Sequence, residues 1–280
     1  MLRRHFIINN GGSTTIINGG LPKDIPNNTI YYWTTESVER INESLFQFTA
    51  YNSNNTKLEL MDNVIKDNIG IITMNGNISI VNFLFFSSSN NIIDVRYIQL
   101  PKSCLGGELL SYGSNLQELY VDSQNINIIA TILPYIAFTP NLHIIKVDKY
   151  NLKYDSRDNC NAIIETETNT LIVGCQNTII PNTVTSIGYG AFCGNTNYNI
   201  NIPDSINNIS SHAFEGCGLT SITLPINITI GTKAFINCLN LTEINYKGTI
   251  EQWNKVTKGK EWNKNVPATV VHCIDGDVEI

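Results

Sequence analysis

The chain has 280 residues and a net charge of −6, with 42% hydrophobic and only 15% charged residues. A chain of this length buries most of the surface that its unfolded form exposes, and its low charge excludes disorder driven by charge repulsion. The acidic balance, without a basic block, argues against nucleic acid as a partner. No stretch approaches the ~18 to 20 apolar residues that a membrane span needs.

The chain starts MLRRHFIINNGG, which places a short apolar run behind two arginines. This run is too short for a secretory signal, so we expect a protein that stays inside its cell or leaves by another route. The start also predicts an assembly arm, a strand that anchors the chain to another subunit, and a frayed terminus is the alternative. The residues of this arm are Arg3, Arg4, Phe6, Ile7 and Ile8.

Residues 1–77 differ in character from the rest of the chain, because paired glycines and two prolines interrupt short apolar runs. The stretch from Tyr31 to Leu60 is compatible with strands, or with a helix in which Val38, Ile41 and Leu45 share one face. We therefore predict a small N-terminal module or cap, β-rich or α+β, over residues 1–77.

A repeat dominates the second half of the chain, and its copies align on Pro181, Pro203 and Pro225. Each proline is followed by an isoleucine and then by an Ala-Phe pair, and the last two copies continue into a strand-like LxxLxL pattern. The isoleucines are Ile187, Ile209 and Ile230, the pairs are Ala191-Phe192, Ala213-Phe214 and Ala234-Phe235, and the LxxLxL triplets are Leu219, Ile222, Leu224 and Leu241, Ile244, Tyr246.

Weaker LxxLxL triplets precede these copies, so we expect the array to begin near residue 78, where the spacing from Ile80 to Phe85 equals that from Ile187 to Phe192. A unit this short cannot enclose its own apolar face and must stack on its neighbours. The prediction is a solenoid of about seven coils over residues 78–248, with a short parallel β-sheet, irregular or helical outer turns and phenylalanines between coils. The weaker triplets are Val95, Ile98, Leu100, then Leu116, Leu119, Val121, then Leu142, Ile145, Val147.

Two features complete the expected solenoid. Residues 161–175, with β-prone runs on both sides of a polar stretch, predict a hairpin that leaves the solenoid. Residues 249–280 predict a C-terminal cap, since Thr249 and Gln252 have capping-box spacing for a short helix that carries Trp253. Trp253 and Trp262 would cover the open end of the stack, and binding of sugar rings is the alternative.

Several of these segments resemble the BspA-like (Treponema pallidum type) leucine-rich repeat family. They are SIGYGAFCGN, SINNISSHAFEGCGLTSITLP and TIGTKAFINCLNLTEINYKG, together with GTIEQWNKVTKGKEWNKNVPATVVHCIDGD, which looks like that family's C-terminal cap. Residues 154–188 resemble the hairpin-bearing repeat of many Bacteroidales members. The resemblance implies a leucine-rich repeat solenoid and a non-enzymatic role, because such proteins often sit on bacterial surfaces and bind host matrix or other cells.

The sequence predicts no catalytic residues, no metal and no cofactor. The histidines are far apart and lack an HxxxH or HExxH pattern, and the seven cysteines stand singly without a CxxC pair. We interpret the cysteines as reduced, mostly buried thiols. Cys217 and Cys238 occupy equivalent repeat positions and should stack, and a disulfide between them is left open for an oxidising environment.

Binding is better supported, because the residues between the LxxLxL anchors face outward along the sheet. Tyrosine and arginine gather in the middle coils, and these residue types dominate protein interfaces. The predicted contact face contains Arg96, Tyr97, Gln99, Gln117, Glu118, Tyr120, His143 and Lys146.

These features favour a structural or attachment protein that binds other proteins, or a cell-surface glycan, by shape. Because the start does not read as a secretory signal, we expect a bacteriophage virion component, such as a head or tail decoration or fibre, whose partners are assembly subunits or further copies of the chain. The alternatives are a bacterial cell-surface BspA-like adhesin, a glycan-active enzyme and an intracellular scaffold in the cytoplasm.

Overall fold

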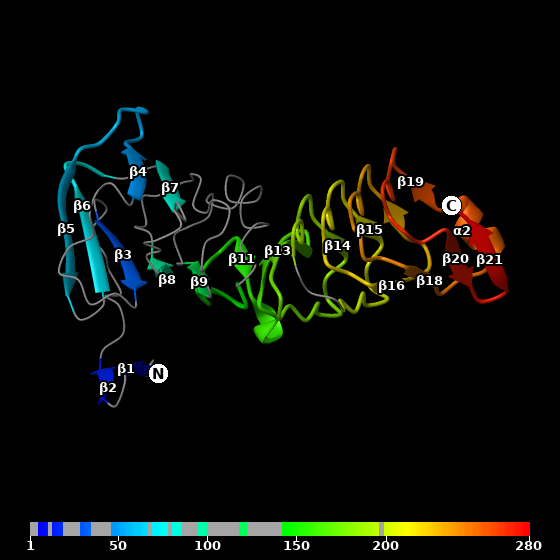
Figure 1. The fold of residues 1–280 in the computed structure, drawn as a ribbon, viewed down its shortest axis with the longest axis horizontal. Coiled ribbons are helices and arrows are strands. Elements are labelled where there is room, and N and C mark those ends of the chain that lie inside the picture. The colour runs from blue at the N-terminus through cyan, green and yellow to red at the C-terminus, as the bar shows by residue number, and fades with distance from the viewer. Residues whose placement is uncertain are drawn as a thin grey trace.

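The computed structural model describes residues 5–10, 13–18, 29–34, 46–66, 69–77, 80–85, 95–99, 118–121, 142–195 and 199–280. It gives side chains for residues 50, 52–62, 71–77, 142–195 and 199–280. Figure 1 shows an elongated molecule, with a group of antiparallel strands at one end and a stack of coils leading to the C-terminus at the other.

The N-terminal strands form three antiparallel groups. The hairpin of β1 and β2 forms a two-stranded sheet of its own, β4 pairs with β7, and a four-stranded sheet has the order β5-β6-β3-β8. The bounds are β1 His5–Asn10, β2 Ser13–Asn18, β3 Thr29–Thr34, β4 Phe46–Tyr51, β5 Leu60–Lys66, β6 Ile69–Met74, β7 Ile80–Phe85 and β8 Val95–Gln99.

Two segments that the sequence assigned to the first coils pair with this N-terminal group. Strand β7 pairs antiparallel with β4, and β8 pairs antiparallel with β3, whereas stacked coils pair in parallel. The reason is physical: an apolar alternation marks a strand but does not specify the direction of its neighbour. The boundary near residue 78 stays a prediction, and the helix considered at Val38, Ile41 and Leu45 falls outside the described residues.

Parallel pairing of LxxLxL segments is present in the middle of the chain. Strand β9 (Glu118–Val121) pairs with β10 (Ile144–Val147), which sets Leu119 opposite Ile145 and Val121 opposite Val147. Ile145 is buried. This register is the one that the phase of the triplets predicts.

From β11 onward the coils build two sheets rather than the single sheet expected from the sequence. One has the order β11-β12-β13-β14-β15-β17-β19, and the other has the order β16-β18-β20-β21. The isoleucine of each repeat, together with the polar residue before it, forms a short strand of the first sheet. The bounds are β11 Tyr154–Asp155, β12 Ala162–Glu165, β13 Thr170–Gly174, β14 Ser186–Ile187, β15 Asn208–Ile209, β16 Ser221–Leu224, β17 Thr229–Ile230, β18 Glu243–Tyr246, β19 Thr257–Lys258, β20 Val270–Cys273 and β21 Gly276–Glu279, and η2 spans Arg157–Asn159.

The phenylalanines of the repeat form a continuous buried stack between the coils. The rings of Phe192 and Phe214 lie 5.2 Å apart, those of Phe214 and Phe235 lie 5.1 Å apart, and both pairs are stacked within 1° of parallel. Trp262 continues the stack edge-on, 6.1 Å from Phe235. The prediction that these phenylalanines fill the space between coils is confirmed.

The outer turns contain left-handed residues at matching positions of successive coils. Gly194, Gly216, Asn237 and Asn265 have φ angles of 68°, 63°, 60° and 64°. Glycine lacks the Cβ that opposes this conformation, and asparagine tolerates it better than most residues. Asn265 Nδ2 also donates to Asn237 Oδ1 at 2.8 Å, so the asparagines bond from coil to coil. Asn237 and Asn265 therefore have a structural role in the turns.

The predicted hairpin is present as antiparallel β12 and β13, but it joins the stack instead of leaving it. Strand β13 pairs in parallel with β14, and Ile163, Ile164 and Leu171 are buried. The hairpin thereby becomes part of the sheet that continues through the coils (Figure 1).

The C-terminal end carries the short helix α2 (Ile250–Lys255), which begins with a capping box. Thr249 Oγ1 accepts from the Gln252 amide at 3.2 Å, and Gln252 Oε1 accepts from the Thr249 amide at 2.8 Å. Trp253 and Trp262 are buried, with their rings 5.8 Å apart. Burial fits the packing of an end cap and leaves neither ring available to stack on a sugar.

Replacement of the central phenylalanine tests the stack. Phe214→Ala empties a position between two rings, and we expect it to lower the free energy of unfolding by about 3 to 5 kcal/mol. Urea denaturation would measure this loss. The control is Leu239→Ala at an exposed position, which should change stability by less than about 0.5 kcal/mol. A loss below about 1 kcal/mol for Phe214→Ala would contradict a buried stack.

The capping box offers a smaller effect at the end of the solenoid. Thr249→Ala leaves the Gln252 amide without its side-chain acceptor, so we expect a loss of about 1 kcal/mol in the same unfolding measurement. Thr269→Ala, at an exposed position of the same end region, is the matched control and should leave stability unchanged. Equal effects of both changes would show that the cap does not support the solenoid.

Candidate binding surface

The structure brings some of the predicted contact residues to adjacent positions. In the parallel pair β9–β10, Tyr120 is opposite Lys146 and Glu118 is opposite Ile144. The Lys146 side chain is exposed, and His143 is half-buried. The contact face along these two strands stays a prediction, and the pairing places its residues in adjacent rows.

The remaining predicted contact residues are placed differently or lie outside what the structure describes. Arg96, Tyr97 and Gln99 belong to β8, which is hydrogen-bonded to β3 and lies outside the sheet of β9 and β10 but runs beside β9. Gln117 lies outside the described residues, and the side chains of Glu118 and Tyr120 are likewise not described. The arm residues Phe6, Ile7 and Ile8 fall in β1, while Arg3 and Arg4 precede the described residues.

Toward the C-terminus the same outward row becomes polar. Thr223 and Asn245 are opposite each other, and Asn245 is opposite His272 in the next strand. Asn245 Nδ2 donates to Glu243 Oε1 at 2.7 Å, and His272 Nδ1 lies 2.8 Å from Asp277 Oδ1. These polar groups already bond to one another, which lowers their value as contact residues.

The loop after β10 differs from this polar row because it exposes apolar side chains. This loop comprises residues 148–153 and is called the 148–153 loop below. Asp148 Oδ1 accepts from the Tyr150 amide at 2.8 Å, and Asn151 Oδ1 accepts from the amides of Lys153 and Tyr154 at 3.0 and 2.9 Å. Two side chains thus fix the backbone of a six-residue segment by the local bonds typical of Asx turns.

The fixed loop presents two apolar side chains to solvent. Tyr150 is 69% exposed and Leu152 is 92% exposed. Lys149 Nζ lies 4.7 Å from the centre of the Tyr150 ring, and Lys153 follows Leu152 directly. In the part of the chain that the structure describes, no carboxylate forms an ion pair with Lys149 or Lys153. An exposed apolar pair between two lysines in the sequence is the candidate contact site of this surface.

Sequence reasoning missed this loop because it concentrated on the repeat positions. Tyr150 and Leu152 lie between two elements and occupy no repeat position, so nothing in the period marks them. The available signal was local. Asp148 and Asn151 directly after an apolar strand are typical of a turn, and an aromatic residue and a leucine within such a turn are placed at the surface.

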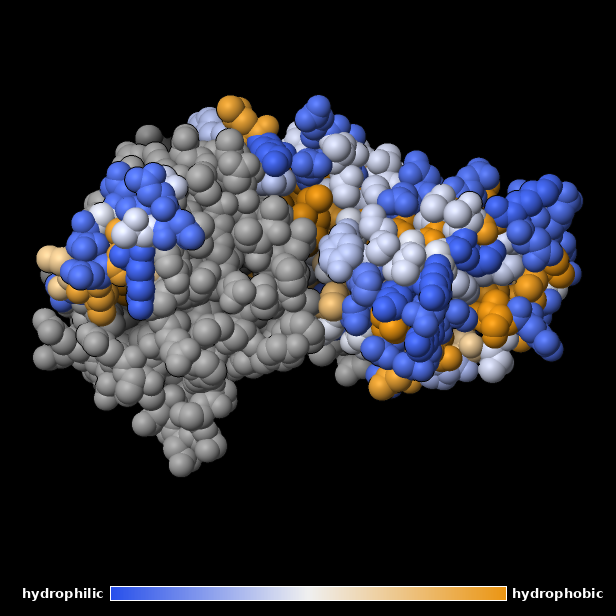
Figure 2. All heavy atoms as spheres, turned by 90° about the horizontal axis from the view of Figure 1, so that it is seen from above, coloured by the Kyte–Doolittle hydropathy of each residue, from blue (hydrophilic) through white to orange (hydrophobic). Residues whose placement is uncertain are grey.

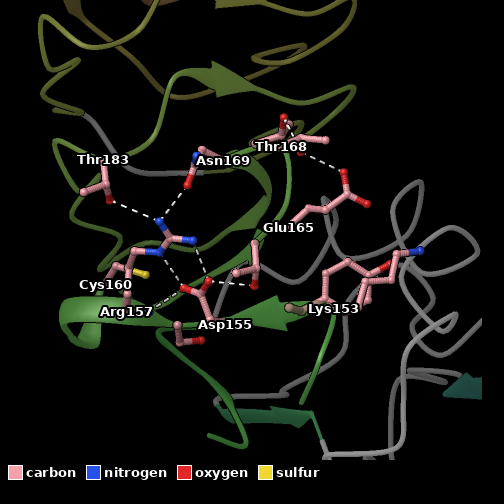
Figure 3. Close-up of polar contacts among 12 residues, drawn as sticks. Lys153, Asp155, Arg157, Cys160, Glu165, Thr168, Asn169 and Thr183 are labelled. Atoms are coloured by element: carbon pink, nitrogen blue, oxygen red, sulfur yellow. Dashed lines mark hydrogen bonds and ion pairs between the residues drawn. The ribbon is translucent and has the colours of Figure 1, made fainter. Parts of the chain in front are cut away.

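An arginine-centred cluster of polar contacts lies directly after the loop in the sequence, at Asp155 and Arg157 (Figure 3). Arg157 Nε and Nη2 donate to the two carboxylate oxygens of Asp155 at 2.8 and 2.6 Å, and Nη1 donates to Asn169 Oδ1 at 2.7 Å and to Thr183 Oγ1 at 3.3 Å. The guanidinium therefore joins β11 to the hairpin and to the following coil. Thr166 Oγ1 adds a further bond to Asp155 at 2.9 Å.

These bonds set the acidity of Asp155. Burial acts to raise the pKa of its carboxyl, but the hydrogen bonds from Arg157 and Thr166 outweigh burial and hold the pKa below its ordinary value. The same pairing raises the pKa of the Arg157 guanidinium. A carboxylate that stays ionised and fully bonded acts as a structural group and is a poor proton donor or acceptor.

The thiols are arranged for packing. Cys217 Sγ and Cys238 Sγ lie 2.6 and 2.8 Å from the carbonyl oxygens of Phe192 and Phe214 in the preceding coils, and both thiols are free. Burial raises the pKa of Cys160 to about 11 and that of Cys193 to about 12. Thiols with such pKa values are protonated at neutral pH, so these cysteines lack the thiolate that a nucleophile needs.

Two further features are absent from the residues that the structure describes. No group of three or more His, Cys, Asp or Glu side chains there has an arrangement that would hold a metal ion. Nor does that part of the molecule contain a helix with the length and apolar character needed to cross a bilayer.

Comparisons with known proteins identify the repeat. Residues 169–257 match the BspA type leucine rich repeat region, with 6 copies. This match includes the coils that contain Phe192, Phe214 and Phe235, so the repeat predicted from Pro181 onward is confirmed. No curated protein matches the sequence.

Three solved structures are similar to the chain. A leucine-rich repeat protein from Eubacterium ventriosum shares 22% identity at a TM-score of 0.45, over 53% of this chain and 41% of that protein, so the chain spans less than half of its length. The pneumococcal vaccine antigen PcpA shares 11% identity at a TM-score of 0.33, over 81% and 87% of the two chains. A leucine rich cell surface protein from Faecalibacterium prausnitzii shares 14% identity at a TM-score of 0.22, over 80% and 99%.

The lowered pKa of Asp155 predicts a pH dependence. In the unfolded chain an aspartate titrates at about 3.9, so the bonds of Asp155 stabilise the fold fully above that pH and the stabilisation is lost as pH falls below it. The urea midpoint of unfolding should therefore drop between pH 6 and pH 3, and this drop should be larger for the parent chain than for Asp155→Asn. Asp158→Asn changes an exposed neighbour and should behave as the parent does. Parallel pH profiles for Asp155→Asn and the parent would refute this role.

Proposed function

We propose that this chain, a BspA-type leucine-rich repeat protein, works without catalysis by binding another protein at a bacterial cell surface. The contact region of this proposal comprises the outward positions of β9 and β10 and the adjoining 148–153 loop. Leucine-rich repeat proteins mediate protein binding, and members of this family are typically found on bacterial surfaces.

The observation that carries the proposal is the fixed, exposed apolar pair of the 148–153 loop. Leu152 and Tyr150 expose most of their surface to water, and two local hydrogen-bond systems prevent the loop from folding them inward. Covering such side chains is favourable, and a loop that is already ordered loses little conformational entropy on binding. Lys146 lies on the strand that leads into this loop and adds a third lysine to the region.

A protein partner is better supported than a glycan. Tryptophans are strong candidates for stacking on sugar rings, yet Trp253 and Trp262 are buried in the cap. Leu152 offers no hydrogen bond to a hydroxyl-rich ligand, whereas an apolar pocket on a protein would accept it. Tyr150 could contact either kind of partner and does not discriminate between them. Leu152 does, and it favours a protein partner.

The virion component expected from the sequence gains no support. That expectation depended only on how the chain starts, and neither the repeat match nor the similar structures point to a virus particle. The alternative, a BspA-like adhesin of the bacterial surface, agrees better with both.

An enzymatic role has less support in the described residues. Asp155 is held ionised by Arg157, and the thiols of Cys160 and Cys193, whose pKa values burial raises, are protonated. Glu165 Oε2 accepts from Thr168 Oγ1 at 2.8 Å on the hairpin, where the two residues satisfy each other. These groups are arranged as structural partners instead of as an acid and a base around a substrate.

Adhesion of coated beads tests the proposed function. Beads that carry the chain should bind the extracellular matrix deposited by cultured epithelial cells, and Leu152→Ala and Tyr150→Ala should each reduce the bound fraction about tenfold, as expected for anchor residues. The matched controls are Leu239→Ala and Tyr189→Ala, which remove exposed side chains elsewhere on the solenoid and should leave adhesion intact.

Treatment of the matrix separates the two kinds of partner. Limited trypsin digestion of the matrix should abolish adhesion if the partner is a protein, while periodate oxidation of its sugars should not. Beads that never adhere, or that adhere equally with the loop variants and the parent, would refute the proposed site. Loss of adhesion with periodate alone would show that the ligand is a glycan.

A further inference from the structure

We propose that the chain associates head to tail, by addition of β1 of one copy to the β21 margin of the next. The proposal concerns self-association and does not depend on the binding function proposed above. It follows from two strand margins with which no described strand pairs, which lie at opposite ends of the molecule, and from the charges near them in the sequence.

The first margin belongs to β21. This strand is the last in the order β16-β18-β20-β21 and pairs on one side with β20. The connection between β20 and β21 has two residues, and Cys273 is opposite Gly276 at its base. In such a hairpin hydrogen-bonded and non-bonded pairs alternate, so the backbone groups of Asp277 and Glu279 point away from β20.

The second margin belongs to β1. Together β1 and β2 form a two-stranded sheet of their own, with Asn10 opposite Ser13 beside the two-residue connection. By the same alternation, the backbone groups of Ile7 and Asn9 point away from β2. An isolated two-stranded hairpin is marginally stable in water, and a further strand is the usual remedy.

Charge selects β21 as the acceptor. Glu279 and Asp277 are two exposed carboxylates within a strand of four residues. Asp277 Oδ1 lies 2.8 Å from His272 Nδ1, and Glu251 of the neighbouring helix α2 is paired with Lys255 at 2.6 Å, so Glu279 carries most of the negative charge that an arm would meet. Arg3 and Arg4 directly precede β1 in the sequence. By contrast β16 has no charged residue, and β5 combines Asp62 with Lys66. Opposite charges favour pairing of β1 with β21. Like charges oppose pairing of β1 with a second β1, or of β21 with a second β21.

The geometry makes the contact intermolecular. Figure 1 shows the β1–β2 hairpin and β21 near opposite ends of the long axis, so one copy does not supply both strands to the same contact. The contact joins the β1 margin of one copy to the β21 margin of another. When a copy is added, one β1 margin and one β21 margin remain free at the two ends of the assembly. Such heterologous contacts generate open chains of subunits when they do not close into a ring. The combined sheet would have the order β16-β18-β20-β21 followed by β1 and β2 of the next copy.

Sedimentation of the purified chain at increasing concentration tests the association. The weight-average mass should rise continuously with concentration, beyond that of a dimer, and should fall when NaCl is raised to 1 M because salt screens the charges. A single monomeric species at all concentrations up to about 200 µM, a range in which weak complexes of this kind still form, would overturn the proposal. A discrete dimer that grows no further would also overturn it.

Proline substitutions test the strand margin itself. Ile7→Pro removes an amide that points away from β2, so the hairpin keeps its internal bonds while the outer margin of β1 loses a donor. We expect association to weaken at least about tenfold. Thr14→Pro is the matched control, because Thr14 is opposite Asn9 and its amide points to the other side of the hairpin. Equal association of the two variants would refute pairing through β1.

A charge exchange tests the choice of β21. Glu279→Lys should weaken association about tenfold, and so should Arg3→Glu combined with Arg4→Glu. Mixing these two variants should restore association, because each supplies the margin that complements the other. Glu243→Lys, an exposed change on β18, is the control and should have no effect. Failure of the mixture to associate while the parent does would show that another surface accepts the arm.

Discussion

The stacking of buried aromatic and aliphatic side chains between coils is the interaction on which the structure depends. One coil has too few residues to enclose Phe214, and the ring becomes buried only because Phe192 and Phe235 lie about 5 Å on either side. The same dependence explains the C-terminal end, where Trp262 and Trp253 occupy the place of a further coil. Removal of one layer therefore exposes the layers on both sides of it.

A stack of this kind places unusual demands on the turns, and asparagine meets them. Each coil reverses direction through left-handed positions that only glycine and a few polar residues adopt readily. At Asn237 and Asn265 the side chains also bond across two coils, so a neutral amide pair links neighbouring turns there. Figure 2 shows apolar residues on the visible side of the solenoid as small separate groups among hydrophilic ones.

The sequence predicted those parts of the molecule in which a residue type recurs at equivalent positions. Pro181 and its successors marked the coils, and the capping box of Thr249 and Gln252 marked the helix. It did not predict that Ile80–Phe85 pairs antiparallel, because strand direction depends on distant residues and not on local alternation. The second sheet was missed for a related reason, since two-residue strands such as Ser186–Ile187 have too few residues to show a period.

The candidate site was predictable only in part. The sequence did not predict the 148–153 loop, and the reason is that a repeat pattern carries limited information about function. A repeat position must satisfy its neighbouring coils, so its side chain is selected for packing. Tyr150 and Leu152 are free of that requirement because the 148–153 loop lies between β10 and β11. The Arg157 cluster, directly after the loop in the sequence, fastens β11 to the hairpin and the next coil, so the C-terminal end of the loop is attached to the stack. The 148–153 loop is thus attached to the stack, and the repeat does not constrain its side chains. Tyr150 and Leu152 can therefore serve as the proposed contacts with a partner.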